Sequence, residues 1–239
     1  MQNEKEVLIL RNIRREGPGI IKDILEEEDI RYLITDSFLE IRKRSLEGIG
    51  ALIVMGGPES ANDLTEKMIG EISVINEFLK SGIPVLGICL GLQVLVKAAG
   101  GKVVKSPVQE VGFRDETGEY YCVDLTAAGR KDPVFSGLES NLPLFQLHGE
   151  MIEPADNMEL LATGKYCSFQ VMKVGSNSYG FQGHHELTRE MLETWLYEDD
   201  DLKKLDRYKV IQDFEDIREQ YTRNGKTIFR NFLKITRLV

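Results

Sequence analysis

Short apolar runs alternate with stretches of helical periodicity over the first hundred residues. The run at 51–55 is apolar throughout, as expected for a strand that is covered on both faces of a parallel sheet. Runs that predict strands lie at 6–12, 31–36, 51–55, 84–88 and 102–105, and patterns that predict helices lie at 18–28, 65–80 and 92–100. This alternation predicts an α/β fold: a doubly wound, mostly parallel sheet with helices on both faces.

The pattern changes after Glu110, where short β-type runs are separated by Gly, Asn, Asp and Pro. These runs lie at 119–126, 143–150, 158–163, 168–175 and 177–183. They predict antiparallel additions to the sheet and a return to its parallel part. A helix is expected next, near 187–196, with Thr188 as its N-terminal cap.

Residues 201–239 carry apolar side chains at three- to four-residue spacing, which predicts amphipathic helix. The pair Asn224–Gly225 is expected to divide this segment into two helices. We therefore predict two parts. The main domain occupies 1–198, and a helical extension at 199–239 packs on that domain or on a second subunit.

Composition narrows the functional classes. The net charge of −9 argues against a nucleic-acid binder, which needs a basic surface for phosphate contacts. No apolar run reaches the roughly 18 residues of a membrane span, and the first run is too short for a signal peptide. The cysteines Cys89, Cys122 and Cys167 have no CxxC spacing, which indicates a reducing compartment without disulfides. We expect a cytoplasmic protein that binds neither nucleic acid nor membrane.

Cys89 lies at the centre of the segment Gly87-Ile88-Cys89-Leu90-Gly91, between a predicted strand and a predicted helix. A nucleophile on such a sharp turn has strained backbone angles and close neighbours, so glycine is needed two positions before and after it. The N-terminus of the following helix stabilises a thiolate. Cys122 and Cys167 lie in alternating apolar stretches and are expected to be small buried residues. Cys89 is therefore the candidate nucleophile.

Gly56 and Gly57 directly follow the apolar run at 51–55. Backbone N–H groups at the end of a neighbouring strand can point into an active site. Together with the N–H of Leu90, that of Gly57 is a candidate oxyanion hole. A simple strand-ending turn would give the same sequence.

The candidates for a general base are His148, His184 and His185. If the run that ends at residue 183 continues as a strand, His184 and Glu186 point to one side and His185 to the other. Glu186 then orients His184, which predicts a Cys–His–Glu triad with no chemical role for His185. Adjacent histidines do not readily bind one ion from a strand, and no HExxH is present, so no metal site is expected.

The segments GGPES (56–60), GICLGLQ (87–93) and YGFQGHHE (179–186) resemble, in order and spacing, the class I (triad) glutamine amidotransferase family. The chain is most similar to stand-alone members that resemble the glutaminase domain of GMP synthase. Two positions depart from the family pattern: Gly183 and His185 stand where Phe and Pro are usual.

The resemblance extends over about residues 7–196, which leaves the C-terminal extension outside it. Shorter matches support it: EGPG at 16–19, EVGF at 110–113 and FQLHGE at 145–150. The family has a flavodoxin-like fold, so the resemblance implies the same sheet that the periodicity predicts.

The resemblance also implies a reaction. The Cys89 thiolate would attack the side-chain amide of glutamine, and the N–H groups of Gly57 and Leu90 would stabilise the oxyanion. His184 would protonate the departing ammonia, after which water would hydrolyse the γ-glutamyl thioester. No cofactor is implied.

Two further positions match substrate-binding segments of the family. Gln93 matches a position that helps hold the substrate, although it would otherwise be an ordinary solvent-facing helix residue. His148 matches a segment that lines the substrate pocket, and a satisfied polar group near a strand end explains it equally well.

Three functions remain open. The first is a glutaminase that supplies ammonia to a synthase; because the chain has neither a P-loop nor SGGxDS, the acceptor chemistry is expected on another polypeptide. The second is a γ-glutamyl hydrolase that uses the same triad on a conjugate or peptide. The third is a non-catalytic binding module. A synthase subunit or a second copy of this chain is the expected partner.

Overall fold

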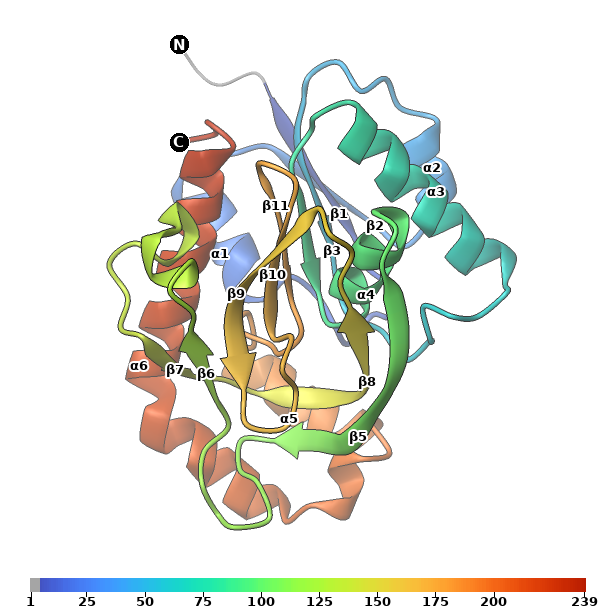
Figure 1. Ribbon diagram of the computed structural model, residues 1–239. Helices are drawn as coiled ribbons and strands as arrows, with labels where there is room; N and C mark the ends of the chain where they lie inside the picture. The colour runs from blue at the N-terminus through green and yellow to red at the C-terminus, as the bar shows by residue number, and fades with distance from the viewer. Residues whose placement is uncertain (1–4) are drawn as a thin grey trace.

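The computed structural model describes residues 5–239, so residues 1–4 of the predicted main domain lie outside it. A nine-stranded sheet with the order β2-β1-β3-β4-β11-β10-β9-β6-β7 forms the centre (Figure 1). Its parallel strands are β1 (Glu6–Leu10), β2 (Tyr32–Thr35), β3 (Ile49–Val54), β4 (Val85–Ile88) and β11 (Ser178–Phe181). Its antiparallel part is β10 (Val171–Val174), β9 (Met158–Gly164), β6 (Cys122–Leu125) and β7 (Asn141–Pro143).

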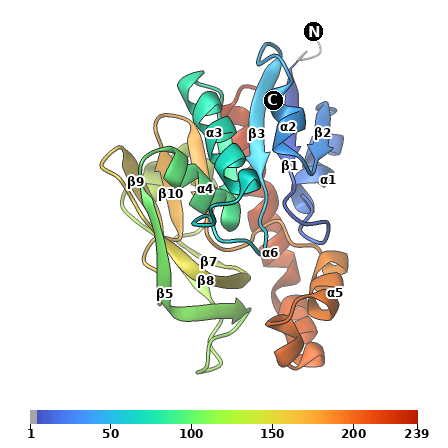
Figure 2. The same ribbon diagram turned by 90° about the vertical axis from the view of Figure 1, so that its right-hand side faces the viewer.

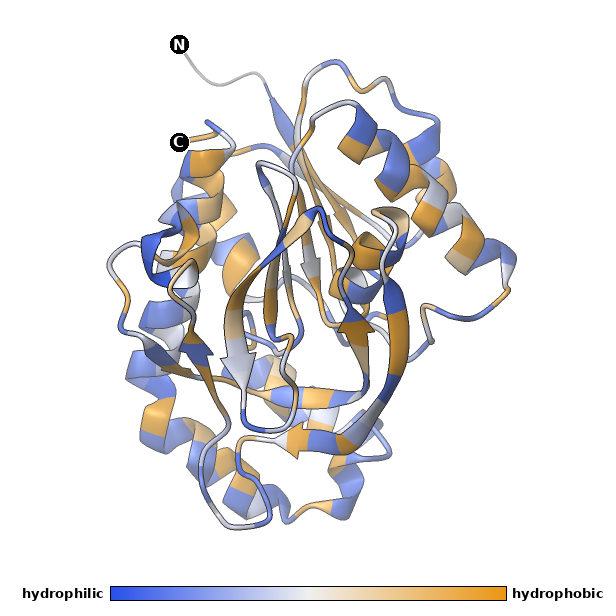
Figure 3. Ribbon diagram, viewed as in Figure 1, coloured by the Kyte–Doolittle hydropathy of each residue, from blue (hydrophilic) through white to orange (hydrophobic). Residues whose placement is uncertain are grey.

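Helices cover both faces of the sheet, with a separate apolar core on each side. One face carries α1 (Ile20–Glu27) and α6 (Arg207–Ile235), and the other carries α2 (Phe38–Arg42), α3 (Glu66–Lys80) and α4 (Leu90–Ala98). The shorter elements are α5 (Arg189–Glu198) and the 3-10 turns η1 (Gly129–Lys131), η2 (Pro133–Phe135) and η3 (Leu202–Lys204). Figure 3 shows the apolar colour gathered on the central strands and on the inner sides of the helices. The predicted α/β fold class is confirmed.

The second half of the sheet is largely as the sequence predicts. Antiparallel strands extend it, and β11 returns to pair in parallel with β4. The predicted strand at 102–105 is placed wrongly, because it is not part of the main sheet. It begins β5 (Lys102–Gly112), which pairs antiparallel with β8 (Gln146–Glu153) in a two-stranded sheet at one end of the molecule (Figure 2). The fully buried β11 occupies the place beside β4, whereas most residues of β5 are exposed or half-buried, which suits a ribbon at the surface.

The C-terminal segment forms one helix where the sequence predicts two. Asn224 and Gly225 are buried inside α6 and do not break it. A Cβ atom at position 225 would overlap the carbonyl oxygen of His185, so glycine is needed for close packing and not for a turn. Tertiary contact thus outweighs the roughly 1 kcal/mol by which glycine disfavours a helix. The division into 1–198 and 199–239 stays a prediction.

Substituting Gly225→Ala tests this contact. Alanine improves helix propensity, yet its methyl group must displace the His185 backbone, so we expect the free energy of unfolding to fall by about 1–3 kcal/mol. Urea unfolding followed by circular dichroism measures the change. Glu219→Ala, at an exposed position of the same helix, is the control and should stay within about 0.5 kcal/mol of the wild type. Equal stability of Gly225→Ala and the control would contradict the packing role.

Candidate active site

Cys89 stands on the sharp turn between β4 and α4 with a positive φ of 53°, a conformation that costs a non-glycine residue about 1–3 kcal/mol. Its neighbours leave no room for side chains. A Cβ on Gly87 would overlap the carbonyl of Gly91, and a Cβ on Gly91 would overlap the carbonyl of Val54. Both glycines of the predicted turn are therefore required by packing.

His184 and Glu186 form a buried pair, with His184 Nδ1 2.7 Å from Glu186 Oε1. The predicted strand alternation does not explain why the two side chains meet, because β11 ends at Phe181. His184 is instead held by a single bridge to Phe145, to whose carbonyl its N–H donates at 2.8 Å. The second carboxylate oxygen of Glu186 accepts the N–H of His185 at 3.0 Å. The pair is thus fixed by local hydrogen bonds rather than by strand geometry.

The surroundings favour the charged form of His184. Burial alone would lower its pKa, but Glu186 and the nearby Cys89 raise it well above the usual value. Trp195 lies edge-on to the imidazole, with ring centroids 4.9 Å apart. The Nε2 atom has no hydrogen-bond partner within residues 5–239, which leaves it free for a reacting group. His184 is therefore suited to carry a proton beside the Cys89 sulfur.

His185 points away from this pair, yet it is not a surface residue. Its ring is buried, stacks on Tyr221 at 27° between planes, and meets Phe181 edge-on. Burial lowers the pKa of His185 to about 4, so the ring is neutral near pH 7. Its role is packing between β11 and α6.

Gly183 is equally constrained. A Cβ there would overlap the Leu144 side chain and lie 2.7 Å from Gln146 Oε1, so a larger residue requires these two side chains to move. The two departures from the family pattern, Gly183 and His185, are both explained by contacts of the segment that carries His184.

A cavity of about 490 Å³ opens above Cys89. The other predicted site residues Gly57, Leu90, Gln93 and His148 all line it. Gly57 lies against Leu90, since a Cβ on Gly57 would come within 3.1 Å of the Leu90 side chain. The two residues proposed to supply the oxyanion hole thus lie side by side and line the same cavity as Cys89, and their role stays a prediction.

Gln93 is buried rather than solvent-facing. Its amide nitrogen lies 3.3 Å from the carbonyl of Glu150 and 3.4 Å from Gln182 Oε1. Gln182 in turn directs its amide nitrogen at the Cys89 sulfur, at 3.8 Å. The sequence places Gln182 inside the YGFQGHHE motif, but only the fold shows that it reaches the nucleophile.

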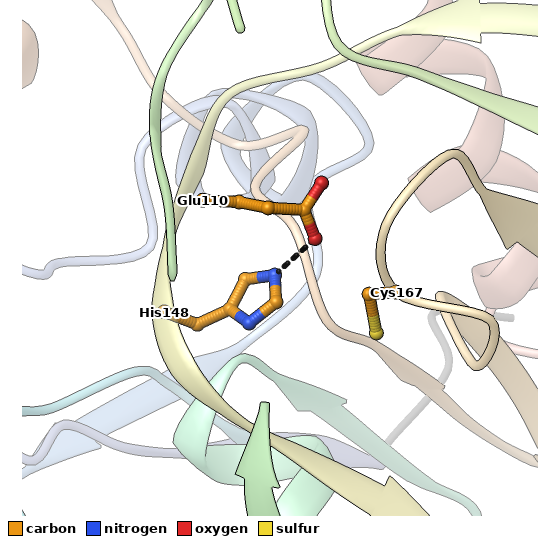
Figure 4. A group of neighbouring side chains, drawn as sticks. All are labelled: Glu110, His148 and Cys167. Carbon is orange, nitrogen blue, oxygen red and sulfur yellow. Dashed lines mark ion pairs between the residues drawn. The ribbon is translucent and has the colours of Figure 1, made fainter. Parts of the chain in front are cut away.

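His148 belongs to a buried group with Glu110 and Cys167, whose possible ligand atoms lie within 4.8 Å of one another (Figure 4). His148 Nε2 lies 3.1 Å from Glu110 Oε2, and its Nδ1 lies 3.0 Å from the carbonyl of Glu150. Burial raises the pKa of the Cys167 thiol to about 12. The contacts of His148 on β8 with Glu110 on β5 and with the carbonyl of Glu150 help to fix the ribbon of β5 and β8.

Sequence reasoning missed Glu16, which lines the same cavity. The residue is only 4% exposed, and burial raises the pKa of its carboxyl to about 7, partly offset by the positive charges of His184 and Arg15. The available signal was the EGPG match at 16–19, which gives no information on where the side chain points.

A family model described as glutamine amidotransferase class-I matches residues 26–200. The chain belongs to this family of enzymes, as its motifs predict. The glutamine amidotransferase-like protein YfeJ of Salmonella typhimurium is 33% identical over 147 residues, 59% of each chain. The glutamine-hydrolysing GMP synthase of Aquifex aeolicus is 31% identical over 169 residues, which are 66% of this chain and 29% of the synthase. The chain thus spans less than two thirds of the length of these relatives.

Solved structures share the fold. A glutamine amidotransferase from Thermotoga maritima has a TM-score of 0.84 over 98% of both chains, at 24% identity. A glutamine amidotransferase from Methylobacillus flagellatus has a TM-score of 0.80 over 98% of this chain and 96% of its own, at 21% identity. Both similarities extend through α6, which lies beyond the residues that the family model matches.

Substituting Glu186→Gln tests the electrostatics of the pair. Without this carboxylate the pKa of His184 should fall, because burial then dominates, and the imidazolium beside Cys89 is lost at a lower pH. We expect alkylation of Cys89 by iodoacetamide at pH 6 to slow about tenfold, the effect of one pKa unit. Mass spectrometry of the labelled peptide gives the rate.

Glu190→Gln is the matched control, since Glu190 lies nearby in α5 but is exposed. Its alkylation rate should equal that of the wild type. Equal rates in Glu186→Gln and in the control would show that Glu186 does not govern the charge of His184.

Proposed function

We propose that the chain is a glutaminase that hydrolyses the side-chain amide of glutamine and releases ammonia. The observation that carries this proposal is the buried His184–Glu186 pair beside Cys89, which itself lines a cavity of about 490 Å³. A buried histidine with a raised pKa, next to a cysteine on a strained turn, is the arrangement that acyl transfer from an amide needs. A non-catalytic binding module gives no reason for keeping these buried charges.

In this reaction the Cys89 sulfur bonds to the amide carbon, and the carbonyl oxygen becomes an oxyanion. The N–H groups of Gly57 and Leu90 would stabilise that charge. The proton on His184 Nε2 passes to the nitrogen, the C–N bond breaks, and ammonia leaves a γ-glutamyl thioester. Water, deprotonated by His184, then attacks the thioester carbon, so that glutamate and the free thiol form.

A γ-glutamyl hydrolase is the second candidate. The cavity supports it, because its volume lies within the range of pockets that hold drug-sized ligands and exceeds the need of one glutamine side chain. The same triad would then cleave a γ-glutamyl conjugate or peptide, and the leaving group would be a larger amine.

We further propose that residues 199–239 are an extension that holds the catalytic segment of the domain at 1–198. The Tyr221 hydroxyl donates to the carbonyl of His184 at 2.8 Å, and Gly225 packs on the carbonyl of His185.

As partners we propose a synthase subunit that consumes the ammonia, or a second copy of this chain, in the cytoplasm. None of the helices within residues 5–239 is long and apolar enough to cross a membrane.

Ammonia release from L-glutamine is the direct test. The wild type should release ammonia, and Cys89→Ala should lower kcat/KM by at least about 10³-fold, because it removes the nucleophile. Cys122→Ala changes a free cysteine on β6, outside the cavity, and should keep full activity. A panel of γ-glutamyl amides, run in parallel, separates the two candidates. Turnover of the panel without glutamine would favour the hydrolase, and ammonia release by Cys89→Ala at the wild-type rate would refute both.

A further inference from the structure

Glu16 supplies a second carboxylate near His184, from a segment far from Glu186 in sequence. Glu16 follows β1, and its Oε2 atom occupies the space beside Gly56 that a side chain there would fill. The Cβ position of such a side chain, not the Glu16 oxygen itself, lies 3.4 Å from His184 Cε1. The absence of a side chain at Gly56 thus lets the Glu16 carboxylate and the Cε1 edge of the imidazole border the same space, where the charge of His184 acts on Glu16.

The carboxylate of Glu16 makes no hydrogen bond within the part of the chain that the structure describes, residues 5–239. Arg15 lies 3.9 Å from Glu16, but its guanidinium is already bound to Asp199 at 2.8 Å. The residue is only 4% exposed, and a buried ionisable group that lines a cavity is a candidate for a functional role. The side chain lines the cavity, so a donor on a bound substrate could reach it.

The charges around Glu16 come from three segments. Its own loop supplies Arg15, the segment after β11 supplies His184 and Glu186, and the end of α5 is followed by Asp199. Burial is the largest influence and raises the pKa of Glu16 to about 7. Near neutral pH the side chain therefore exists both as a carboxylate and as a carboxylic acid.

We propose that Glu16 is a further catalytic residue, which accepts a hydrogen bond from the leaving nitrogen of the substrate amide. This inference rests on the proposed amide hydrolysis and adds to it the recognition of the leaving group. The substrate class it defines is a γ-glutamyl amide with at least one N–H, rather than an ester.

The chemistry follows from the position of His184. When the thiolate adds to the amide carbon, the nitrogen becomes tetrahedral and gains a lone pair that must face His184 Nε2 to receive its proton. A nitrogen that donates an N–H to Glu16, next to His184 Cε1, has its lone pair turned toward Nε2. Glu16 takes up no proton in this step, and the proton that breaks the C–N bond still comes from His184.

Two substrates and two variants of Glu16 test the assignment, with a control variant described below. L-Glutamine has an N–H on its leaving group, whereas the γ-p-nitrophenyl ester of glutamate has none and needs no proton to leave. Glu16→Met keeps the size of the side chain but removes the acceptor, and Glu16→Gln keeps a neutral acceptor. We expect Glu16→Met to lower kcat on glutamine at least about tenfold, with Glu16→Gln less affected, while kcat on the ester stays within about twofold.

The pH profile provides a second readout. Because the carboxylate form is the acceptor, kcat/KM of the wild type on glutamine should rise through about pH 7, and this rise should be missing in Glu16→Met. Glu71→Gln is the matched control. Glu71 is also buried and its pKa is also raised by burial to about 7, but it lies on α3 and outside the cavity, so this variant should keep both the rates and the profile.

The outcomes separate the two proposals. If the wild type hydrolyses glutamine and Glu16→Met lowers both substrates equally, or neither, the role of Glu16 is refuted while the glutaminase stands. If the wild type hydrolyses neither substrate, the proposed function fails and takes the role of Glu16 with it. A selective loss on the amide, together with the missing rise near pH 7, supports the assignment.

Discussion

Burial of the His184–Glu186 ion pair is the constraint around which the candidate site is organised. Two ionisable groups removed from water are stable together only when hydrogen bonds satisfy their remaining atoms. Here the N–H of His185 satisfies Glu186, and Trp195 and other aromatic rings exclude solvent from the imidazole. The chemistry proposed for Cys89 depends on this dry environment, because water around the imidazole would weaken the attraction of Glu186 that raises the pKa of His184.

The segment that carries this pair is held from two sides, and this explains features that look unrelated in the sequence. The linker before β8 contributes Phe145, which forms a single bridge to His184. From the other side, α6 contributes the Tyr221 hydroxyl and the close approach of Gly225. The ring of His185 fills the space beside Tyr221, so its difference from the family pattern follows from the packing of this helix.

Features that depend on neighbours in sequence could be predicted, and those that depend on distant contacts could not. The turn at Cys89 was predictable because its two glycines are needed within five residues. The strand at 102–105 has a clear β pattern, but a pattern does not say which strand it pairs with. Gly225 has the signature of a helix break until the backbone of His185 is placed against it. Glu16 meets His184 across 168 positions of the chain, a proximity that only the fold creates.

The sheet order has a consequence for how the protein is made. β11 lies between β4 and β10, so the two halves of the sheet join only through a strand near residue 180. A ribosome therefore completes β1 to β4 and the turn with Cys89 long before their last neighbour exists. During that interval β4 is an unpaired and wholly apolar edge, the kind of surface that promotes aggregation. The strand that protects this edge is also the one that brings His184 to the cysteine, so the nascent chain cannot acquire a complete site before its sheet is closed.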